Sequence, residues 1–374
     1  MSNFEAKIGN DKIRNYFVHS SVLIDVDGAS LNNWGRDDTN TRERENASAV
    51  KKVYKNGRWY AVVAGQAWRY WWRESLGLNG WNLSPITRDK KVAFTDANPL
   101  EYEDDDIFGY MKASKDDEVD DSGEVVQDKK GNTKKVDVSV TRVSPLKNSI
   151  LTSVTPIKLI NEFSSMGRHF DKLLEKAPEA PVLYEKQSYS TLLKGMFSLD
   201  LDQVGTFTKT NRSGYKNITD ITFKQIIEDG GSEVSDLINP NIPRARLNIE
   251  TRRKRAKDTI SALKTIAGGA KRTTNYASVK PDFIILAVLK GGNNIFDNIA
   301  VEEDGRATLS LKALEEAIRD NKEYFRSDVF IGKATGFMDE VVIKEQEMEG
   351  IKINIGSINT MIDEFVKVLD TVVI

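Results

Sequence analysis

The pattern of hydrophobic and polar positions predicts an α+β protein whose core contains two buried strands. Residues 17–26 mix alternation with β-branched side chains, which indicates a first core strand ending at Asp27-Gly28-Ala29. Residues 283–288 are apolar throughout and predict a second buried strand. Further elements are predicted as helices at 64–77, 246–267, 309–325 and 358–369 and as strands at 183–201 and 328–333.

The segment 51–77 carries the clearest local signals. Asn56-Gly57 between β-forming residues predicts a hairpin, which is followed by a helix whose aromatic residues go most of the way round. Gln66, Arg69 and Arg73 recur at helical spacing and can share one face of that helix. Two guanidinium groups and an amide suit a phosphodiester backbone. The alternative is that both arginines pair with acids at the edge of the core.

The middle of the chain predicts an insertion and an arm. Residues 81–121 are turn-rich and then strongly acidic, which is typical of a mostly exposed and partly disordered segment. A hairpin with strands at 123–127 and 134–143 is predicted next, with Arg142 and Lys147 beside its exit. An amphipathic segment at 159–176 follows.

Two polar loops supply further candidate contacts for a finger or a thumb. The Asn- and Arg-rich loop at 31–46 is too polar for a core. The loop at 206–217 combines bases with an aromatic residue, a mixture that can follow a single strand through charge and stacking. The candidate residues are Asn32, Asn33, Arg36, Arg42, Arg44, Arg212 and Lys216.

Composition narrows the classes of protein that fit. The 374 residues include no cysteine, which excludes disulfides, cysteine-ligated zinc, iron–sulfur clusters and thiol catalysis and is consistent with a reducing cytoplasm. No apolar run is long enough to span a membrane. The net charge of −2 hides two poles. Residues 101–121 carry ten acids and two bases, and residues 244–272 carry ten bases and two acids.

The junction at 267–274 lies between the predicted basic helix and the second core strand. Gly268 and Gly269 allow a close backbone approach, and Lys271 and Arg272 follow at once. This combination predicts a loop that faces phosphates. A helix C-cap followed by an ordinary turn explains the same residues equally well.

Catalytic patterns are scarce. The sequence lacks a Walker A pattern, Gly-x-Ser-x-Gly, His-Glu-x-x-His and a Rossmann fingerprint after a strand. The pairs Asp200 and Asp202, and Asp25 and Asp27, have spacings that can hold a metal ion, although such pairs are more often strand ends facing solvent. We therefore expect no enzyme, no cofactor and no metal site.

Several segments together resemble one family, the repeated backbone subunit of type I CRISPR surveillance complexes (Cascade) in its DevR-like type I-B branch. They occur in the family's order over roughly residues 15–290, and the acidic insertion after Glu101 departs from the family pattern. The segments are the first strand through Asn33, Gly65 to Glu74, Thr141 to Lys147, Tyr189 to Gly205, and Gly268 to Arg272.

The resemblance implies one large hand-shaped domain. Its palm is expected to be a modified RRM, a ferredoxin-like βαββαβ sheet, at about 12–31, 58–80, 136–176 and 242–374. Fingers are expected at about 32–57 and 81–135, and a thumb-like segment at about 183–241.

The resemblance also implies a function. Copies are expected to form a helical filament along a CRISPR RNA, without cleaving it, while guide–target pairing reads sequence. Implied partners are the CRISPR RNA, a target DNA strand, further copies of the chain, and other Cascade subunits, namely an RNA-processing endonuclease, a 5′-end cap subunit and large and small subunits. The expected RNA-binding residues are Gln66, Arg69, Arg73, Arg142, Lys147, Gly268, Gly269, Lys271 and Arg272.

Two other functions remain open at this stage. A metal-dependent nuclease would use one of the two aspartate pairs, Asp200 with Asp202 or Asp25 with Asp27. A structural protein whose acidic and basic poles pair only with each other would self-assemble without nucleic acid.

Overall fold

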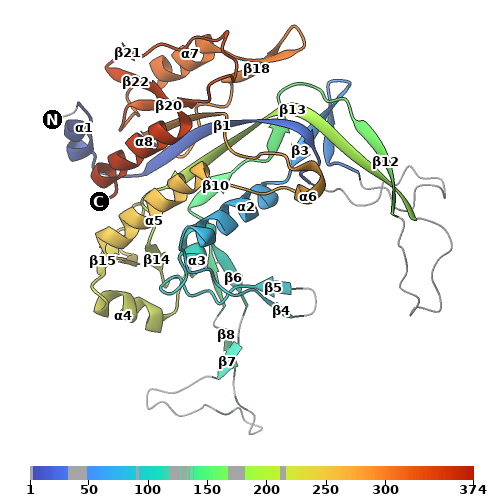
Figure 1. Ribbon diagram of the computed structural model, residues 1–374. Coiled ribbons are helices and arrows are strands. Elements are labelled where there is room, and N and C mark those ends of the chain that lie inside the picture. The colour runs from blue at the N-terminus through green and yellow to red at the C-terminus, as the bar shows by residue number, and fades with distance from the viewer. Residues whose placement is uncertain are drawn as a thin grey trace, which may run out of the picture.

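The computed structural model describes residues 3–32, 49–89, 92–113, 115–117, 127, 133, 135–137, 139–166, 182–210 and 216–374. The structure is a mixed α/β fold around a large mixed sheet (Figure 1). Of the predicted candidates, Asn33, Arg36, Arg42, Arg44 and Arg212 lie outside the described residues. No helix among the described residues is long and apolar enough to cross a membrane.

The large sheet is organised around its two longest strands, β1 and β13. Its strands are antiparallel except for the parallel pair β20 and β22. In spatial order they are β2 (Lys52–Lys55), β3 (Arg58–Val63), β11 (Leu151–Ser153), β13 (Val182–Asp200), β1 (Tyr16–Ala29), β17 (Phe283–Lys290), β20 (Val329–Lys333), β22 (Ile351–Gly356) and β21 (Gln346–Met348), with β10 (Leu146–Asn148) and β12 (Ile160–Met166) also paired to β13.

Strand β1 is central because both of its edges and both of its faces are covered. It pairs with β13 on one side and β17 on the other, and side chains in its first half, such as Val18 and His19, are buried on either face. The predicted core strands at 17–26 and 283–288 are therefore confirmed. The predicted hairpin at 51–63 is confirmed too, with Asn56 and Gly57 both at positive φ as a tight two-residue turn requires.

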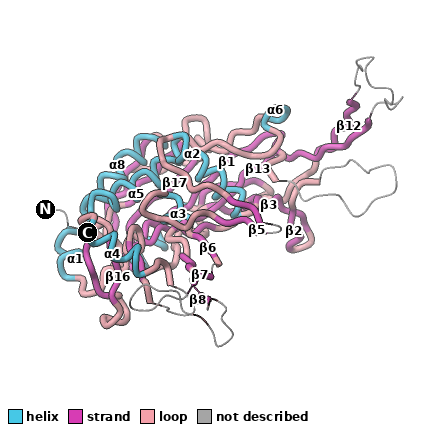
Figure 2. The backbone as a smooth tube through the Cα atoms, turned by 90° about the horizontal axis from the view of Figure 1, so that it is seen from below, coloured by secondary structure: helices cyan, strands magenta, loops and turns pink. Residues whose placement is uncertain are grey.

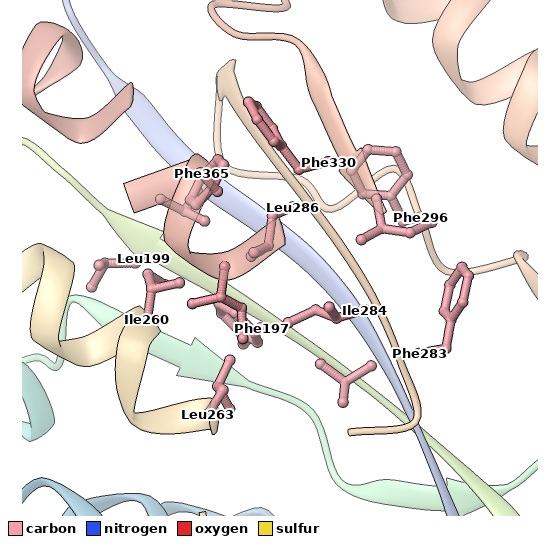
Figure 3. Packing of buried hydrophobic residues seen from close by; sticks show 14 of the residues in the cluster. Phe197, Leu199, Ile260, Leu263, Phe283, Ile284, Leu286, Phe296, Phe330 and Phe365 are labelled. Atoms are coloured by element: carbon pink, nitrogen blue, oxygen red, sulfur yellow. The ribbon is translucent and has the colours of Figure 1, made fainter. Parts of the chain in front are cut away.

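Three amphipathic helices pack on the sheet: α2 (Gly65–Leu78), α5 (Ile249–Ser261) and α8 (Ile358–Val372) (Figures 1 and 2). Asn248 and Ser357 begin α5 and α8 by accepting a hydrogen bond from a backbone N–H three residues later. Figure 3 shows residues of α5, α8 and the turn after α5 gathered with the sheet residues Phe197 and Leu286 in one core.

Helix α2 is fastened by tryptophans. Trp72 lies edge-on to Phe197 with ring centroids 4.9 Å apart, and its Nε1 donates to the carbonyl of Thr259 at 2.7 Å. Trp68 packs over Gly195, where a Cβ would come within 2.9 Å of the indole. The predicted helix at 64–77 is thus confirmed, and its aromatic residues fix it to both the sheet and α5.

A smaller lobe extends from the end of β13. The strands β14 (Thr206–Thr208), β16 (Pro243–Arg246) and β15 (Ser232–Ser235) form a sheet, which α4 (Asp220–Glu228) covers. Phe207, Phe223 and Ile226 are buried in its own apolar cluster.

The remaining elements are short. They are α1 (Asn3–Asn10), β4 (Thr87–Asp89), β5 (Val92–Phe94), α3 (Glu103–Phe108), β6 (Tyr110–Lys112), β7 (Lys115–Asp117), β8 (Lys135–Asp137), β9 (Val140–Arg142), α6 (Arg272–Asn275), β18 (Ala300–Glu303), β19 (Arg306–Leu309) and α7 (Leu311–Asn321).

Two predicted segments differ in the structure. The return strand of the predicted arm pairs with residues 110–112 and 115–117, since β9 pairs with β6 and β8 with β7. Of the predicted first strand, residues 123–126 lie outside the described residues, and Gln127 forms an isolated bridge with Thr133. The amphipathic segment at 159–176 is strand β12 over 160–166, paired along its length with 182–188. Together β12 and the first half of β13 form a hairpin that projects beyond the helices in Figures 1 and 2.

Candidate nucleic-acid interface

The arginines of α2 turn into the protein. Arg69 donates to the carbonyls of Leu146 at 2.6 Å and Phe108 at 2.9 Å and to Ser144 Oγ at 2.8 Å. Burial lowers the pKa of Arg69 to about 10. Its guanidinium therefore has a structural role between α2 and the segment 144–148, and it does not face a phosphate in this conformation.

Arg73 has a similar role. Its Nε donates to Asp104 Oδ2 at 2.6 Å, and its Nη2 donates to the carbonyl of Ser84 at 2.8 Å. Of the predicted contacts on α2, Gln66 is the one with an exposed side chain. Arg73 therefore matches the alternative that the sequence left open, in which the arginine pairs with an acid at the edge of the core.

Arg142 is buried, with 4% of its surface exposed. It forms an ion pair with Asp106, donates to the carbonyls of Thr206 at 2.9 Å and Gln203 at 2.7 Å, and lies 4.2 Å from the centroid of the Phe207 ring. The prediction that Arg142 faces an RNA is therefore corrected, because its donors are committed to protein acceptors.

Helix α3 corrects the prediction of an exposed acidic insertion. Asp104, Asp105 and Asp106 are all buried. Asp106 accepts from Arg255 Nη1 at 2.8 Å and from the backbone N–H of Gly205 at 2.9 Å, in addition to its ion pair with Arg142. Burial raises the pKa of Asp105. The acidic and basic stretches of the sequence thus meet inside one chain.

Most of the basic stretch 244–272 is likewise engaged. Asp202 binds Arg244 at 2.6 Å and Arg246 at 2.5 Å. Eight of the ten bases contact acceptors of the protein, namely Arg244, Arg246, Arg252, Arg253, Lys254, Arg255, Lys257 and Lys264. The remaining two, Lys271 and Arg272, belong to the junction.

The two glycines of the junction are explained by packing. A Cβ at Gly268 would overlap the indole ring of Trp71 in α2. Gly269 has φ +94°, and a Cβ there would come within 2.6 Å of Leu31 Cδ2. These contacts correct the reason given for Gly268 and Gly269, because the close approach is to the protein's own side chains.

The loop that follows, residues 271–276 including α6, lies at the surface and is tied to the end of β1. Asn275 Nδ2 donates to the carbonyl of Gly28 at 2.8 Å, and the N–H of Ala270 donates to the carbonyl of Leu31 at 3.2 Å. Arg272 is exposed, and its guanidinium lies 5.9 Å from the Tyr276 ring centroid. The sequence prediction missed Tyr276, which is 79% exposed, although an aromatic residue just after two bases was a usable signal.

The 271–276 loop lies beside the projecting hairpin, as Figure 2 shows. Partial burial lowers the pKa of Lys271, and the nearby Lys186 of β13 lowers it further while Glu162 of β12 opposes this. Lys271 and Tyr276 both have positive φ, of 55° and 20°, which is uncommon for residues other than glycine. Such strained backbone is found at functional sites more often than elsewhere.

Lys147 lies far from this loop. It is exposed on β10 opposite Ser198, which pairs with His19 near the start of β1. Because the loop contacts Gly28 at the other end of β1, nine residues separate the two positions, or roughly 30 Å along the strand. The structure therefore does not bring all the predicted bases into one groove.

Two further candidates serve as anchors. Asn32 Oδ1 accepts from the N–H of Ala64 at 2.9 Å, and its carbonyl accepts from the N–H of Lys51 at 3.2 Å, which joins β1 to α2 and the 51–63 hairpin. The carbonyl of Lys216 accepts from the N–H of Thr141 at 2.9 Å, and its side chain is partly exposed.

The paired aspartates are engaged in other ways. Asp202 binds two guanidinium groups, and Asp200 accepts from Gln203 Nε2 at 2.8 Å. Asp27 accepts from Ser190, and the N–H of Asp25 donates to Asp282. In the part of the chain that the structure describes, no group of three or more His, Cys, Asp or Glu residues could hold a metal ion.

A family model matches most of this chain, and chains of solved structures are similar to it. A family model described as "CRISPR-associated negative auto-regulator DevR/Csa2" matches residues 21–304. A chain of a solved "CRISPR RNA-guided surveillance complex" is similar at 13% identity and a TM-score of 0.48, over 94% of this chain and 98% of that one. A chain of a "CRISPR RNA-guided surveillance complex, pre-nicking" is similar at 12% identity and a TM-score of 0.48, over 94% and 99%. No curated protein matches.

Proposed function

Since this chain belongs to the CRISPR-associated DevR/Csa2 family, we propose that it is a non-catalytic, RNA-binding backbone subunit. Copies of it oligomerise along a CRISPR RNA within a cytoplasmic, RNA-guided DNA surveillance (Cascade) complex for antiviral defence. The observation that carries this proposal is the 271–276 loop, which presents Arg272 and Tyr276 to solvent on a fixed support.

The chemistry of this loop suits a single strand. A guanidinium can neutralise a phosphate, and an exposed tyrosine ring can stack on a base of any identity. Arg272 is exposed on this loop, where its guanidinium can meet a polyanion. Gln66 on α2 adds an exposed amide to the proposed RNA contacts. Lys147 adds an exposed ammonium group at a separate place on the surface.

The buried members of the predicted set act indirectly in this proposal. Gly268 and Gly269 let the loop sit against Trp71 and Leu31. Arg69 and Arg73 fix the orientation of α2. These residues position the RNA-binding surface without contacting the RNA.

The projecting hairpin formed by β12 and β13 supports the oligomeric part of the proposal. Phe163 on β12 is 78% exposed, and the hairpin extends beyond the body of the molecule (Figure 2). We assign it to contacts with a neighbouring copy or with the RNA, in a finger or thumb role around a modified RRM palm. The target DNA strand, the RNA-processing endonuclease, the 5′-end cap subunit and the large and small subunits are the proposed further partners.

The test begins with the purified full chain. We expect nucleic acid to co-purify, seen as a raised ratio of absorbance at 260 nm to that at 280 nm, and a particle larger than a monomer. We also expect salt-sensitive binding of single-stranded RNA and no cleavage of labelled RNA or DNA with magnesium. A nucleic-acid-free monomer that ignores single-stranded RNA at low salt would contradict the proposal.

A further inference from the structure

A cleft of about 650 Å³ opens where β1 begins, on the side of the smaller lobe. We call it the β1 cleft. Its walls include the segment that enters β1, the turn that follows β13, strand β14, and the loop at 236–242 with the following Arg244 of β16. Nothing in the proposed RNA contact at residues 271–276 uses this cleft, because that loop lies at the other end of β1.

Two polar groups that line the cleft have no hydrogen-bond partner. Asn15 Oδ1 is a buried acceptor without a donor, and Arg244 Nε is a buried donor without an acceptor. The Arg244 side chain is only 8% exposed, its Nη atoms bind Asp202, and its Nε lies 3.8 Å from Asp236 Oδ2, beyond hydrogen-bond distance. Because buried polar groups are rarely left unpaired, these two atoms suit a ligand that carries both a donor and an acceptor.

The rest of the cleft is suited to a flat, partly apolar group. The Phe17 ring, Leu237 and Ile242 line it, and Ile13 and Ile238 stand exposed at its edge. Asp200 also lines the cleft, and burial raises its pKa, to which the neighbouring Asp202 adds. An acid-lined interior accepts amino groups and disfavours a phosphate, so the buried part of the ligand is neutral and carries N–H donors.

A second cavity of about 380 Å³ adjoins the first and is lined by more bases than acids, the acids being Asp11 and Asp202. The two share Asp202, Leu237 and Arg244 as a common wall. The second cavity is lined by Lys12 and Arg14, both exposed, which flank Ile13 of the β1 cleft in sequence. These two cations provide a place for an anion next to a pocket for a neutral ring.

We propose that the β1 cleft binds one nucleotide of a single-stranded RNA, with the nucleobase in the cleft and its phosphate at Lys12 and Arg14. The base edge supplies the donor for Asn15 Oδ1 and the acceptor for Arg244 Nε. This site deepens the proposed function, on which it rests for the source of the nucleotide. Lys147, whose Nζ lies 5.6 Å from the centroid of the Phe17 ring, brings a third cation to the same wall.

Free 5′-nucleoside monophosphates test the site without any RNA. Saturation-transfer NMR on the full chain should show contact at the base protons, competed by excess unlabelled nucleotide. Ile238→Trp should block the cleft and abolish the signal. Ile221→Trp is the matched control, because Ile221 on α4 is equally exposed at 79% and does not line the cleft.

Two further variants separate the base contact from the phosphate contact. Asn15→Leu removes the unpaired acceptor. It should lower the affinity of every nucleotide that donates a hydrogen bond to it by about tenfold. Lys12→Ala with Arg14→Ala should lower the affinity for monophosphates by about threefold to fivefold and leave the affinity for the corresponding nucleosides unchanged. Equal losses of affinity for nucleosides and monophosphates in this variant would contradict a phosphate contact at Lys12 and Arg14.

These experiments distinguish a failure of the cleft proposal from a failure of the proposed RNA-binding function. If RNA binds through the 271–276 loop but no monophosphate contacts the protein, or Ile238→Trp and Ile221→Trp behave alike, the cleft proposal is overturned and RNA binding stands. If neither RNA nor any monophosphate binds, both are overturned. A signal lost only in Ile238→Trp supports the cleft.

Discussion

Helix α3 and the 271–276 loop are both charged segments, and the structure uses them in opposite ways. Asp104 and Asp106 of α3 are buried and held by arginines from three other elements, Arg73, Arg142 and Arg255. The bases of the 271–276 loop lie at the surface, and the loop is held in place by backbone hydrogen bonds and by the packing of two glycines.

The difference shows that charge density alone does not reveal exposure. Asp104 and Asp106 are buried because three arginines from other segments pair with them, while Asp105 between them accepts a hydrogen bond from the N–H of Asn98. Lys271 is partly exposed and Arg272 is exposed, on a loop whose preceding glycines pack against Trp71 and Leu31. Four predictions, ordered by their expected effect on stability, test this contrast.

The largest effect is expected from α3. Asp106→Ala leaves Arg142 and Arg255 buried without their shared counter-ion, and should lower the free energy of unfolding by about 3–5 kcal/mol. Chemical denaturation followed by tryptophan fluorescence measures this. The control is Glu101→Gln, an exposed acid in the same stretch, which should change stability by less than about 0.5 kcal/mol. Equal stability of the two variants would show that the buried ion pairs are not needed.

A smaller effect is expected at the support of the loop. Gly268→Ala forces a methyl group into the Trp71 ring and should destabilise the protein by about 1–3 kcal/mol. Gly9→Ala is the matched control, because Gly9 lies in helix α1 with open space around it and should be neutral or slightly stabilising. A neutral Gly268→Ala would mean that the loop is free to move away from α2.

His19 extends the contrast to a buried group without a counter-ion. Burial lowers its pKa from 6.5, the Gly291 carbonyl acting in the opposite sense and Lys147 in the same sense. The unfolded chain therefore binds a proton at a higher pH than the folded chain does. Stability should fall as the pH drops below about 6.5, and His19→Gln should flatten this dependence between pH 7 and pH 5. An unchanged pH profile in that variant would contradict the shift.

The smallest effect on stability is expected where the effect on binding is largest. Lys271→Ala with Arg272→Ala should leave unfolding nearly unchanged, since Arg272 is exposed. Affinity for single-stranded RNA should fall equally for unrelated sequences, and the salt slope should decrease by about 1.4 for two lost phosphate contacts. Fluorescence anisotropy across a salt series provides both numbers, and a loss confined to one sequence would exclude backbone binding.

Local pattern predicted the elements of the core well. The strand at 17–26, the Asn56-Gly57 hairpin and the helix at 64–77 are all confirmed, because apolar periodicity and turn chemistry act over a few residues. The partners of the polar residues could not be predicted in this way. Asp106 and Arg255 are 149 residues apart, and no local sequence pattern predicts their contact.

The candidate site shows the same limit. Lys271 and Arg272 were identified from their position after two glycines, but the glycines themselves serve the packing of Trp71 and Leu31. The β1 cleft was not foreseen, because Asn15, Asp200 and Arg244 come from distant segments that only the sheet and the smaller lobe bring together.

Strand β13 links two distant parts of the protein. Its 19 residues run without a break from the projecting hairpin, past the centre of the sheet, to Asp200 at the wall of the β1 cleft. At about 3.3 Å per residue it spans roughly 60 Å. One continuous strand therefore connects the hairpin that is proposed to meet a neighbouring copy with the wall of the β1 cleft.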